Sequence, residues 1–152
     1  MIRKAGVKDV VTIGSILKHY SDKGELLPRA ISEIYAHIRD FFIHEDDRLT
    51  ITGVCALHIW WNDLAEIRSL AVTECCQSQG IGSMLIAEAL KEAKELGVGK
   101  VFALTYKKEF FQKHRFHVVD KSQLPQKIWT ECIKCVKFPD CDEIAMLLSP
   151  LP

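Results

Sequence analysis

A short polar segment with two glycines is the part of the sequence best suited to chemistry. Gln77, Gly80 and Gly82 form the pattern Gln-x-x-Gly-x-Gly, directly after an extended run at 66–72 and directly before a long helical pattern. The first turn of a helix presents unpaired backbone N–H groups and the positive end of the helix dipole. Glycines let an anion approach such backbone closely. The segment therefore predicts a phosphate-binding turn between a strand and a helix.

Two common phosphate loops do not fit this segment. The Walker pattern requires a Gly-Lys-Ser/Thr ending, which is absent, and the dinucleotide fingerprint requires three glycines where this turn has Gly80 and Gly82. A phosphate loop of a third kind remains, with an ordinary strand–turn–helix junction as the alternative.

Composition limits the partners of such a site. The chain has 152 residues, 48% of them hydrophobic, and its 20 basic side chains balance its 20 acidic ones. No global basic field therefore indicates nucleic acid or a membrane surface as a partner. No apolar run approaches the ~20 residues that span a bilayer, and no signal peptide is evident. We expect a cytoplasmic protein whose six cysteines are thiols or metal ligands rather than disulfides.

Hydrophobic periodicity predicts the elements that position the turn. Leu85, Ala89, Ala93 and Leu96 are expected to form the inner stripe of the helix that follows it. Gly53 suggests a bulge or a close contact within a strand. Strands are expected at 2–5, 41–44, 49–60, 64–72, 101–105, 116–119 and 144–148, and helices at 7–20, 30–39, 80–96, 109–114 and 126–132.

The turn and the order of these elements resemble the GNAT superfamily of N-acetyltransferases. The resemblance implies an α/β (α+β) fold in which helices flank both faces of a central mixed, mostly antiparallel sheet. It also implies one acetyltransferase domain over residues 1–152, with acetyl-CoA as co-substrate.

By this resemblance, two segments hold the cofactor. The pantetheine arm would pair with the backbone of Leu70, Ala71 and Val72 as an added strand, and one of these amides would polarise the thioester carbonyl. The pyrophosphate would lie on the N–H groups of the turn and the helix start, formed by Gln77, Ser78, Gln79, Gly80, Ile81, Gly82, Ser83 and Met84.

Glu66 is the candidate general base. It lies six residues before Val72 on the expected central strand, where histone-type relatives carry a catalytic glutamate. Alternation places Glu66, Arg68 and Leu70 on one face of the strand unless a bulge intervenes. The alternative for Glu66 is a structural salt bridge to Arg68 or another neighbour.

The general acid is harder to assign. The superfamily often has a tyrosine near the fourth helix that protonates the leaving thiolate, but the matching dipeptide here is Phe110-Phe111. Phe111 occupies the position of that tyrosine, and we expect it to contact the cofactor. Tyr106, just past the fifth strand, is the substitute candidate for the acid, with packing at the strand end as its alternative.

Longer stretches resemble the short bacterial N-acetylglutamate synthases. They are Leu-Leu-Pro-Arg at 26–29, Ile-Arg-Asp-Phe-Phe at 38–42, Ala-Leu-His at 56–58, 65–72, 101–106, Phe-Phe-Gln-Lys at 110–113, Leu-Pro-x-Lys-x-Trp at 124–129 and Glu-x-Ala-Met at 143–146. The implied reaction transfers the acetyl group of acetyl-CoA to the α-amino group of L-glutamate, the first step of arginine synthesis. The family often forms homodimers.

A dicarboxylate acceptor requires cationic partners, ideally guanidinium groups. Arg29, Arg68 and Lys127 are the candidates. Arg29 could instead be a surface arginine after a proline, and Arg68 an ion-pair partner of Glu66. Acetylation of another small-molecule amine or of a protein N-terminus remains an alternative, as does a non-catalytic acyl-CoA-binding module.

A group of cysteines near the C-terminus raises the question of a metal. Cys132, Cys135 and Cys141 could ligate zinc with a fourth ligand such as His117 or Cys75. Because their spacing supplies only half of a four-cysteine site, free thiols are the preferred interpretation and no metal is assigned.

Overall fold

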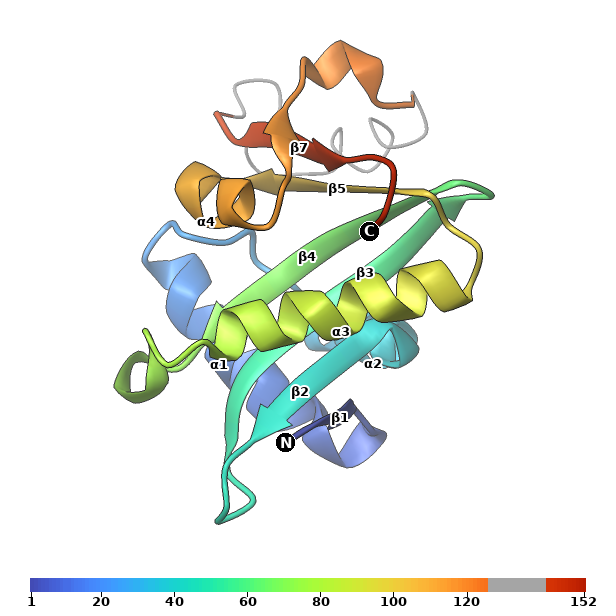
Figure 1. Ribbon diagram of the computed structural model, residues 1–152. Helices are drawn as coiled ribbons and strands as arrows, with labels where there is room; N and C mark the ends of the chain where they lie inside the picture. Colours follow the sequence, from blue (N-terminus) through green and yellow to red (C-terminus); the bar gives the residue numbers. More distant parts are fainter. Residues whose placement is uncertain (126–141) are drawn as a thin grey trace.

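A seven-stranded sheet forms the centre of the computed structural model, which describes residues 1–125 and 142–152 (Figure 1). Its strand order is β1-β2-β3-β4-β5-β7-β6. Of the recorded strand pairs, β4 with β5 is parallel and the others are antiparallel. The strands are β1 (Ile2–Lys4), β2 (Phe41–Glu45), β3 (Ile51–Trp61), β4 (Leu64–Val72), β5 (Lys100–Thr105), β6 (His117–Val118) and β7 (Ile144–Leu148).

Helices cover both faces of this sheet, as Figure 1 shows. One face carries α3 and α4, and the core there includes Leu85, Ile86 and Phe111. The other face carries α1 and α2, which pack Ile13 and Ile34 against the sheet. The helices are α1 (Val10–Asp22), α2 (Ile31–Ala36), α3 (Ile81–Glu95) and α4 (Lys108–Lys113), with short 3-10 turns η1 (Val7–Asp9), η2 (Ile38–Asp40), η3 (Glu74–Cys76) and η4 (Lys121–Gln123). The predicted fold class is confirmed.

Several elements agree closely with the sequence prediction. Strands β4 and β7 have the predicted bounds, and α3 begins one residue after Gly80. Gly53 makes the predicted close contact, because a Cβ there would lie 2.9 Å from Ile81 Cγ2 and 3.0 Å from Leu85 Cδ1. The missing side chain therefore lets α3 pack directly on β3. The predicted helix at 126–132 lies outside the described residues.

One member of the predicted inner stripe of α3 is wrong. Leu96 is 60% exposed, whereas Leu85, Ala89 and Ala93 are fully buried. The helix ends before Leu96, and Gly97 then reverses the chain with φ of 85°. Val98 is buried in place of Leu96, and its N–H bonds the carbonyl of Ala93 at 2.9 Å. This is the usual way for a helix to end at a left-handed glycine.

None of the described helices combines the length and the apolar character needed to cross a membrane.

Candidate active site

Strands β4 and β5 pair at one end and separate at the other. Their parallel pairing covers only Leu64 to Glu66 on β4, whereas β3 stays paired with β4 as far as Val72. Figure 1 shows the two strands spreading apart toward α4 and the beginning of α3. The edge of β4 at 67–72 therefore faces the gap, where its backbone groups can pair with an extended ligand arm. Leu70, Ala71 and Val72, the predicted thioester segment, lie on this edge.

A bulge on β4 separates the two predicted functions of this strand. The register moves from Ala56 opposite Arg68 to Val54 opposite Ala71, and Ser69 has φ of 55°. Ile67 and Leu70 consequently both face the core under α3, although they are an odd number of positions apart in the strand. Leu70 therefore does not share the face of Glu66 and Arg68. The bulge ends the alternation at the point where the strand begins to face the gap.

The glycine turn has the geometry of an anion cradle. Gly80 has φ of 81° and Ser78 φ of 66°, and the first intrahelical bond of α3 runs from Met84 N–H to Gly80 O at 3.0 Å. The N–H groups of the residues at 81–83 are thus left without partners inside the helix. A Cβ on Gly82 would lie 3.2 Å from Phe110 Cζ, so glycine lets α4 approach the helix start. The arrangement can bind a phosphate through the backbone N–H groups at the start of α3 and the positive end of the helix dipole.

The side chain of Gln77 ties this turn to the end of β4. Its Nε2 donates to Tyr20 Oη at 2.7 Å and to Val72 O at 3.1 Å, and the Tyr20 hydroxyl also donates to Val72 O. Burial raises the pKa of Tyr20, which keeps its hydroxyl protonated as a donor. The sequence did not indicate Tyr20 as part of the site, because it places this residue only at the end of the helix predicted at 7–20.

Glu66 is a buried carboxylate with two partners. It is 7% exposed, accepts a hydrogen bond from Trp60 Nε1 at 3.0 Å, and lies 3.8 Å from Arg68 Nη1. Burial raises the pKa of Glu66, while the charge of Arg68 and the hydrogen bond from Trp60 act against that rise. A carboxylate with a raised pKa is better suited to accept a proton from an ammonium group.

Trp60 was not predicted as a site residue. Of the two adjacent tryptophans at the end of β3, Trp61 is 60% exposed, whereas Trp60 packs against the cluster that contains Phe102. The indole N–H of a partly buried tryptophan needs an acceptor, and Glu66 supplies it.

A small pocket brings the two predicted arginines together. Arg29 precedes α2 and Arg68 lies on β4, and both line this pocket. The Arg29 guanidinium is 3.6 Å from Glu33 Oε2. The full lining is Arg29, Glu33, Ile34, His37, Phe41, Arg68 and Ser69. His37 was not predicted, and no motif in the sequence distinguishes it. Lys127 lies outside the described residues.

Two further predicted residues lie apart from this pocket. The Tyr106 hydroxyl donates to Asp142 Oδ1 at 2.6 Å, so its proton is directed to a carboxylate near the end of the chain. Phe111 is 4% exposed and packs edge-to-face on Phe116, whereas Phe110 is the aromatic ring beside Gly82. The acid role of Tyr106 and the cofactor contact of Phe111 stay predictions, and Phe110 has the better position for that contact.

The cysteines offer no assembled metal site among the described residues. Cys55 is buried, and Cys75 and Cys76 lie in η3 with their sulfur atoms 3.3 Å apart. Cys132, Cys135 and Cys141 lie outside the described residues.

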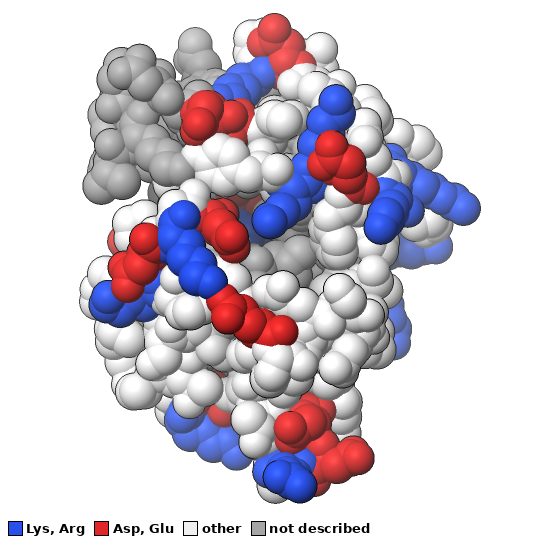
Figure 2. Space-filling view, turned by 90° about the vertical axis from the view of Figure 1, so that its left-hand side faces the viewer, with Lys and Arg blue, Asp and Glu red and all other residues white. Residues whose placement is uncertain are grey.

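Figure 2 shows the molecule from the side on which β4 and β5 separate. Basic and acidic side chains are interspersed on this face, in keeping with the equal counts of the two kinds in the sequence. Attraction of an anionic ligand must therefore come from local groups, such as the helix start and the arginine pocket.

The fold and the glycine turn together define a known class of protein. A family model described as "Acetyltransferase (GNAT) family" matches residues 15–117. The chain belongs to this family, which confirms the resemblance given by the turn and the element order.

Three relatives refine the comparison. An uncharacterized N-acetyltransferase of Chlorobaculum tepidum is 40% identical over 96% of this chain and 94% of its own length. An amino-acid acetyltransferase of Mycobacterium tuberculosis is 31% identical over 86% of this chain and 76% of its own length. An amino-acid acetyltransferase of Neisseria meningitidis is 32% identical, but the match covers only 29% of its length.

Solved structures agree with these sequence matches. Rv2747 from Mycobacterium tuberculosis, solved in complex with CoA, has a TM-score of 0.85 at 28% identity, and the match covers 99% of both chains. N-acetylglutamate synthase from Neisseria gonorrhoeae, complexed with coenzyme A and N-acetyl-glutamate, has a TM-score of 0.89 at 25% identity. That match covers all of this chain and 35% of the synthase.

Proposed function

We propose that this N-acetyltransferase moves the acetyl group of acetyl-CoA to the α-amino group of L-glutamate. The observation that carries the proposal is the pocket in which Arg29 and Arg68 lie together, with Arg68 3.8 Å from the buried Glu66. Two guanidinium groups next to a candidate base suit an amine that carries carboxylates, and they disfavour a cationic acceptor such as lysine. The names of the amino-acid acetyltransferase relatives support the same class of acceptor.

Each part of the site has a separate task in this mechanism. Backbone N–H groups from Gln77 to Met84 bind the pyrophosphate, and the edge of β4 at Leu70–Val72 aligns the pantetheine arm. One amide of that edge stabilises the oxyanion as the amine attacks the thioester. Glu66 accepts the amine proton, directly or through water, and the C–S bond breaks as the carbonyl re-forms. CoA leaves as the thiol after protonation, for which Tyr106 is the candidate acid.

Substitution of the two arginines tests the acceptor pocket. Arg29→Ala and Arg68→Ala should each lower kcat/KM for glutamate roughly 10- to 100-fold, since a hydrogen-bonded charge pair contributes about 1.5–3 kcal/mol. The KM for acetyl-CoA should change little. Arg39→Ala is the matched control, because Arg39 is an exposed arginine in η2 that does not line the pocket. Unchanged glutamate kinetics in both pocket variants would remove the basis of the proposal.

A further inference from the structure

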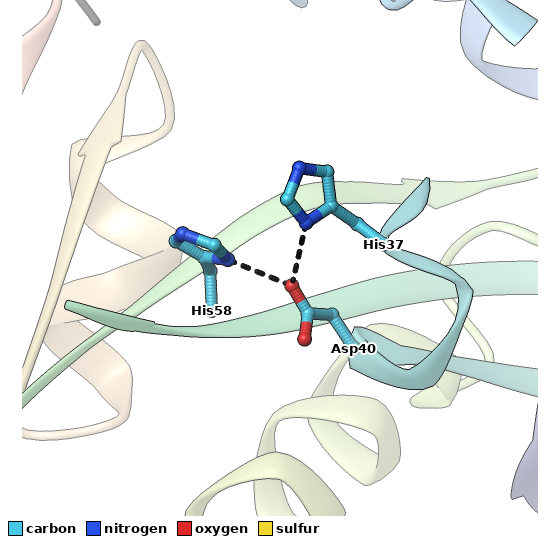
Figure 3. Close-up of side chains that lie close together, drawn as sticks. All are labelled: His37, Asp40 and His58. Atoms are coloured by element: carbon cyan, nitrogen blue, oxygen red, sulfur yellow. Dashed lines mark hydrogen bonds and ion pairs between the residues drawn. The ribbon is translucent and has the colours of Figure 1, made fainter. Parts of the chain in front are cut away.

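Two imidazoles and a carboxylate meet beside the acceptor pocket, at the junction of α2, η2 and β3 (Figure 3). His58 Nδ1 lies 2.7 Å from Asp40 Oδ2, and His37 Nδ1 lies 3.9 Å from the same oxygen. One ligand atom from each residue lies within 4.8 Å of the other two. The three side chains thus point toward a common centre, although they come from separate elements.

The spacing of these atoms is close to that of a metal site. Three ligands at zinc distances of about 2.0–2.2 Å lie roughly 3.3 Å from one another in a tetrahedral site. The His58–Asp40 distance is shorter than this value and the His37–Asp40 distance is longer. Small side-chain rotations would therefore bring all three onto one ion. Two histidines and one carboxylate form a recurrent ligand set for divalent transition metals, and they leave a position open.

The surroundings hold the rings in place and leave access for an ion. His58 is packed edge-to-face between His37, at a centroid distance of 5.2 Å, and Trp60, at 4.9 Å. The side chains of His37, Asp40 and His58 are 42%, 23% and 18% exposed. The packed ring of His58 can hold a metal ion firmly, and the more exposed ring of His37 leaves a path by which the ion can enter.

The charges nearby also permit a cation at this position. The two guanidinium groups of the neighbouring pocket each have a carboxylate close by, Glu33 for Arg29 and Glu66 for Arg68. The Asp40 carboxylate is held between the two imidazoles. A bound cation would give the Asp40 carboxylate a full counter-charge.

We propose that His37, Asp40 and His58 form a binding site for a divalent transition metal, with zinc as the preferred ion. His37 also lines the pocket of Arg29 and Arg68, so a metal bound here would lie beside the acceptor pocket. In the absence of metal, Asp40 and His58 form a hydrogen-bonded pair. Zinc affinity, which can be measured directly, distinguishes a metal site from such a pair.

The test uses the full chain without an affinity tag, carrying Cys132→Ser, Cys135→Ser and Cys141→Ser and stripped with a chelator. Zn²⁺ is titrated against a chromophoric competitor, and Co²⁺ absorption reports the ligand type. We expect stoichiometric zinc binding and cobalt bands without thiolate-to-metal charge transfer. His37→Ala and Asp40→Asn should each weaken zinc binding at least ~10-fold, as loss of a ligand removes more than the 10–100-fold contributed by outer partners.

His19→Ala is the matched control, because His19 is a half-exposed histidine on α1, paired with Glu74 and outside the cluster. It should leave zinc affinity unchanged. Circular dichroism and thermal unfolding establish that each variant is folded, and having two ligand variants keeps the test decisive if one of them is not. No zinc binding, a thiolate band, or equal affinity in His37→Ala and His19→Ala would overturn the proposal. None of these readouts depends on acetyl transfer, so the acceptor assignment is tested separately.

Discussion

At the scale of single residues, the pKa of the Glu66 carboxyl links the structure to the proposed role of Glu66 as general base. Burial raises this pKa, and the hydrogen bond from Trp60 Nε1 and the charge of Arg68 limit the rise by stabilising the ionised form. A raised pKa makes the Glu66 carboxylate a stronger base and so suits it to accept a proton from the acceptor amine. The position of Glu66 on the predicted strand indicated this residue as a candidate base. The sequence did not indicate its hydrogen bond from Trp60, because a cross-strand bond of this kind depends on strand register and on the side-chain rotamer of the tryptophan.

Removal of the Glu66 carboxylate should affect the chemical step. We expect Glu66→Gln to lower kcat about 100-fold or more, the contribution typical of a general base, while KM for acetyl-CoA stays within a factor of about three. Steady-state kinetics in the presence of a chelator provide the measurement. Glu74→Gln is a suitable control, since Glu74 is an exposed carboxylate in η3. A variant with nearly normal kcat would show that Glu66 is structural.

Trp60→Phe offers a finer test of the same carboxyl. Without the indole N–H, the ionised form of Glu66 loses a hydrogen bond, so its pKa should rise further. The acidic limb of the profile of kcat/KM against pH should then move to higher pH, while the rate at the plateau stays similar. A limb that does not move, or that moves to lower pH, would contradict the assignment of Glu66 as the group that titrates there.

At the scale of elements, the separation of β4 from β5 and the beginning of α3 together form the proposed cofactor site. The sequence predicted the bounds of β4 and the turn, since glycines and apolar periodicity are local signals. It did not predict the bulge at Ser69, because a bulge depends on the register between β3 and β4. The bulge decides that Glu66 and Leu70 lie on opposite faces of the strand.

The contact of Gly53 with α3 should couple β3 to cofactor binding. Gly53→Ala places a methyl group 2.9 Å from Ile81 Cγ2, so α3 must move at its first turn. We expect a loss of about 1–3 kcal/mol in the free energy of unfolding, as for other overpacked cores, and weaker CoA binding. Chemical denaturation and calorimetric titration with CoA measure the two effects. Gly6→Ala is the control, because its nearest contact would be an ordinary 3.8 Å. Equal CoA affinity in both variants would argue against the coupling.

At the scale of the whole molecule, an ion-pair cluster joins the N-terminal elements to the sheet. Arg3 on β1 bonds Asp9 Oδ2 at 2.8 Å and also bonds Glu45 at the end of β2. Hydrogen bonds from Arg3 lower the pKa of Asp9, whose side chain is 6% exposed, and the Gly6 N–H adds to the effect. None of these residues lines the acceptor pocket, so we expect the contacts to act on stability.

Asp9→Asn should destabilise the protein by about 2 kcal/mol at neutral pH, because it removes one partner of a largely buried pair. The pKa of Asp9 is lowered in the folded state, so the contribution of the pair is complete above the unfolded pKa, near 4. It is lost as the pH falls from there through the lowered folded value. Denaturation curves of the two proteins should converge over that acidic range. A difference that persists or grows at low pH would contradict this role.

Most of the fold was predictable because hydrophobic periodicity, glycine positions and the order of the elements can be read directly from the sequence. The two arginines were predicted individually, but their common pocket depends on the loop before α2 folding against β4. The cluster of His37, Asp40 and His58 was not predicted, because no spacing in the sequence indicates that β3 and η2 meet. Contacts between distant segments are where the structure adds most to the sequence.

The central claim, an acidic amino acid as acceptor, is tested most directly by kcat/KM for L-glutamate, L-glutamine, L-aspartate and L-lysine with acetyl-CoA. Release of CoA is measured, and the acetylated product is identified by mass spectrometry. We predict that glutamate exceeds glutamine and lysine by at least ~10-fold, since each guanidinium contact to a carboxylate contributes more than 1.4 kcal/mol. A preference for lysine, or no CoA release with any of the four amino acids, would contradict the proposed function.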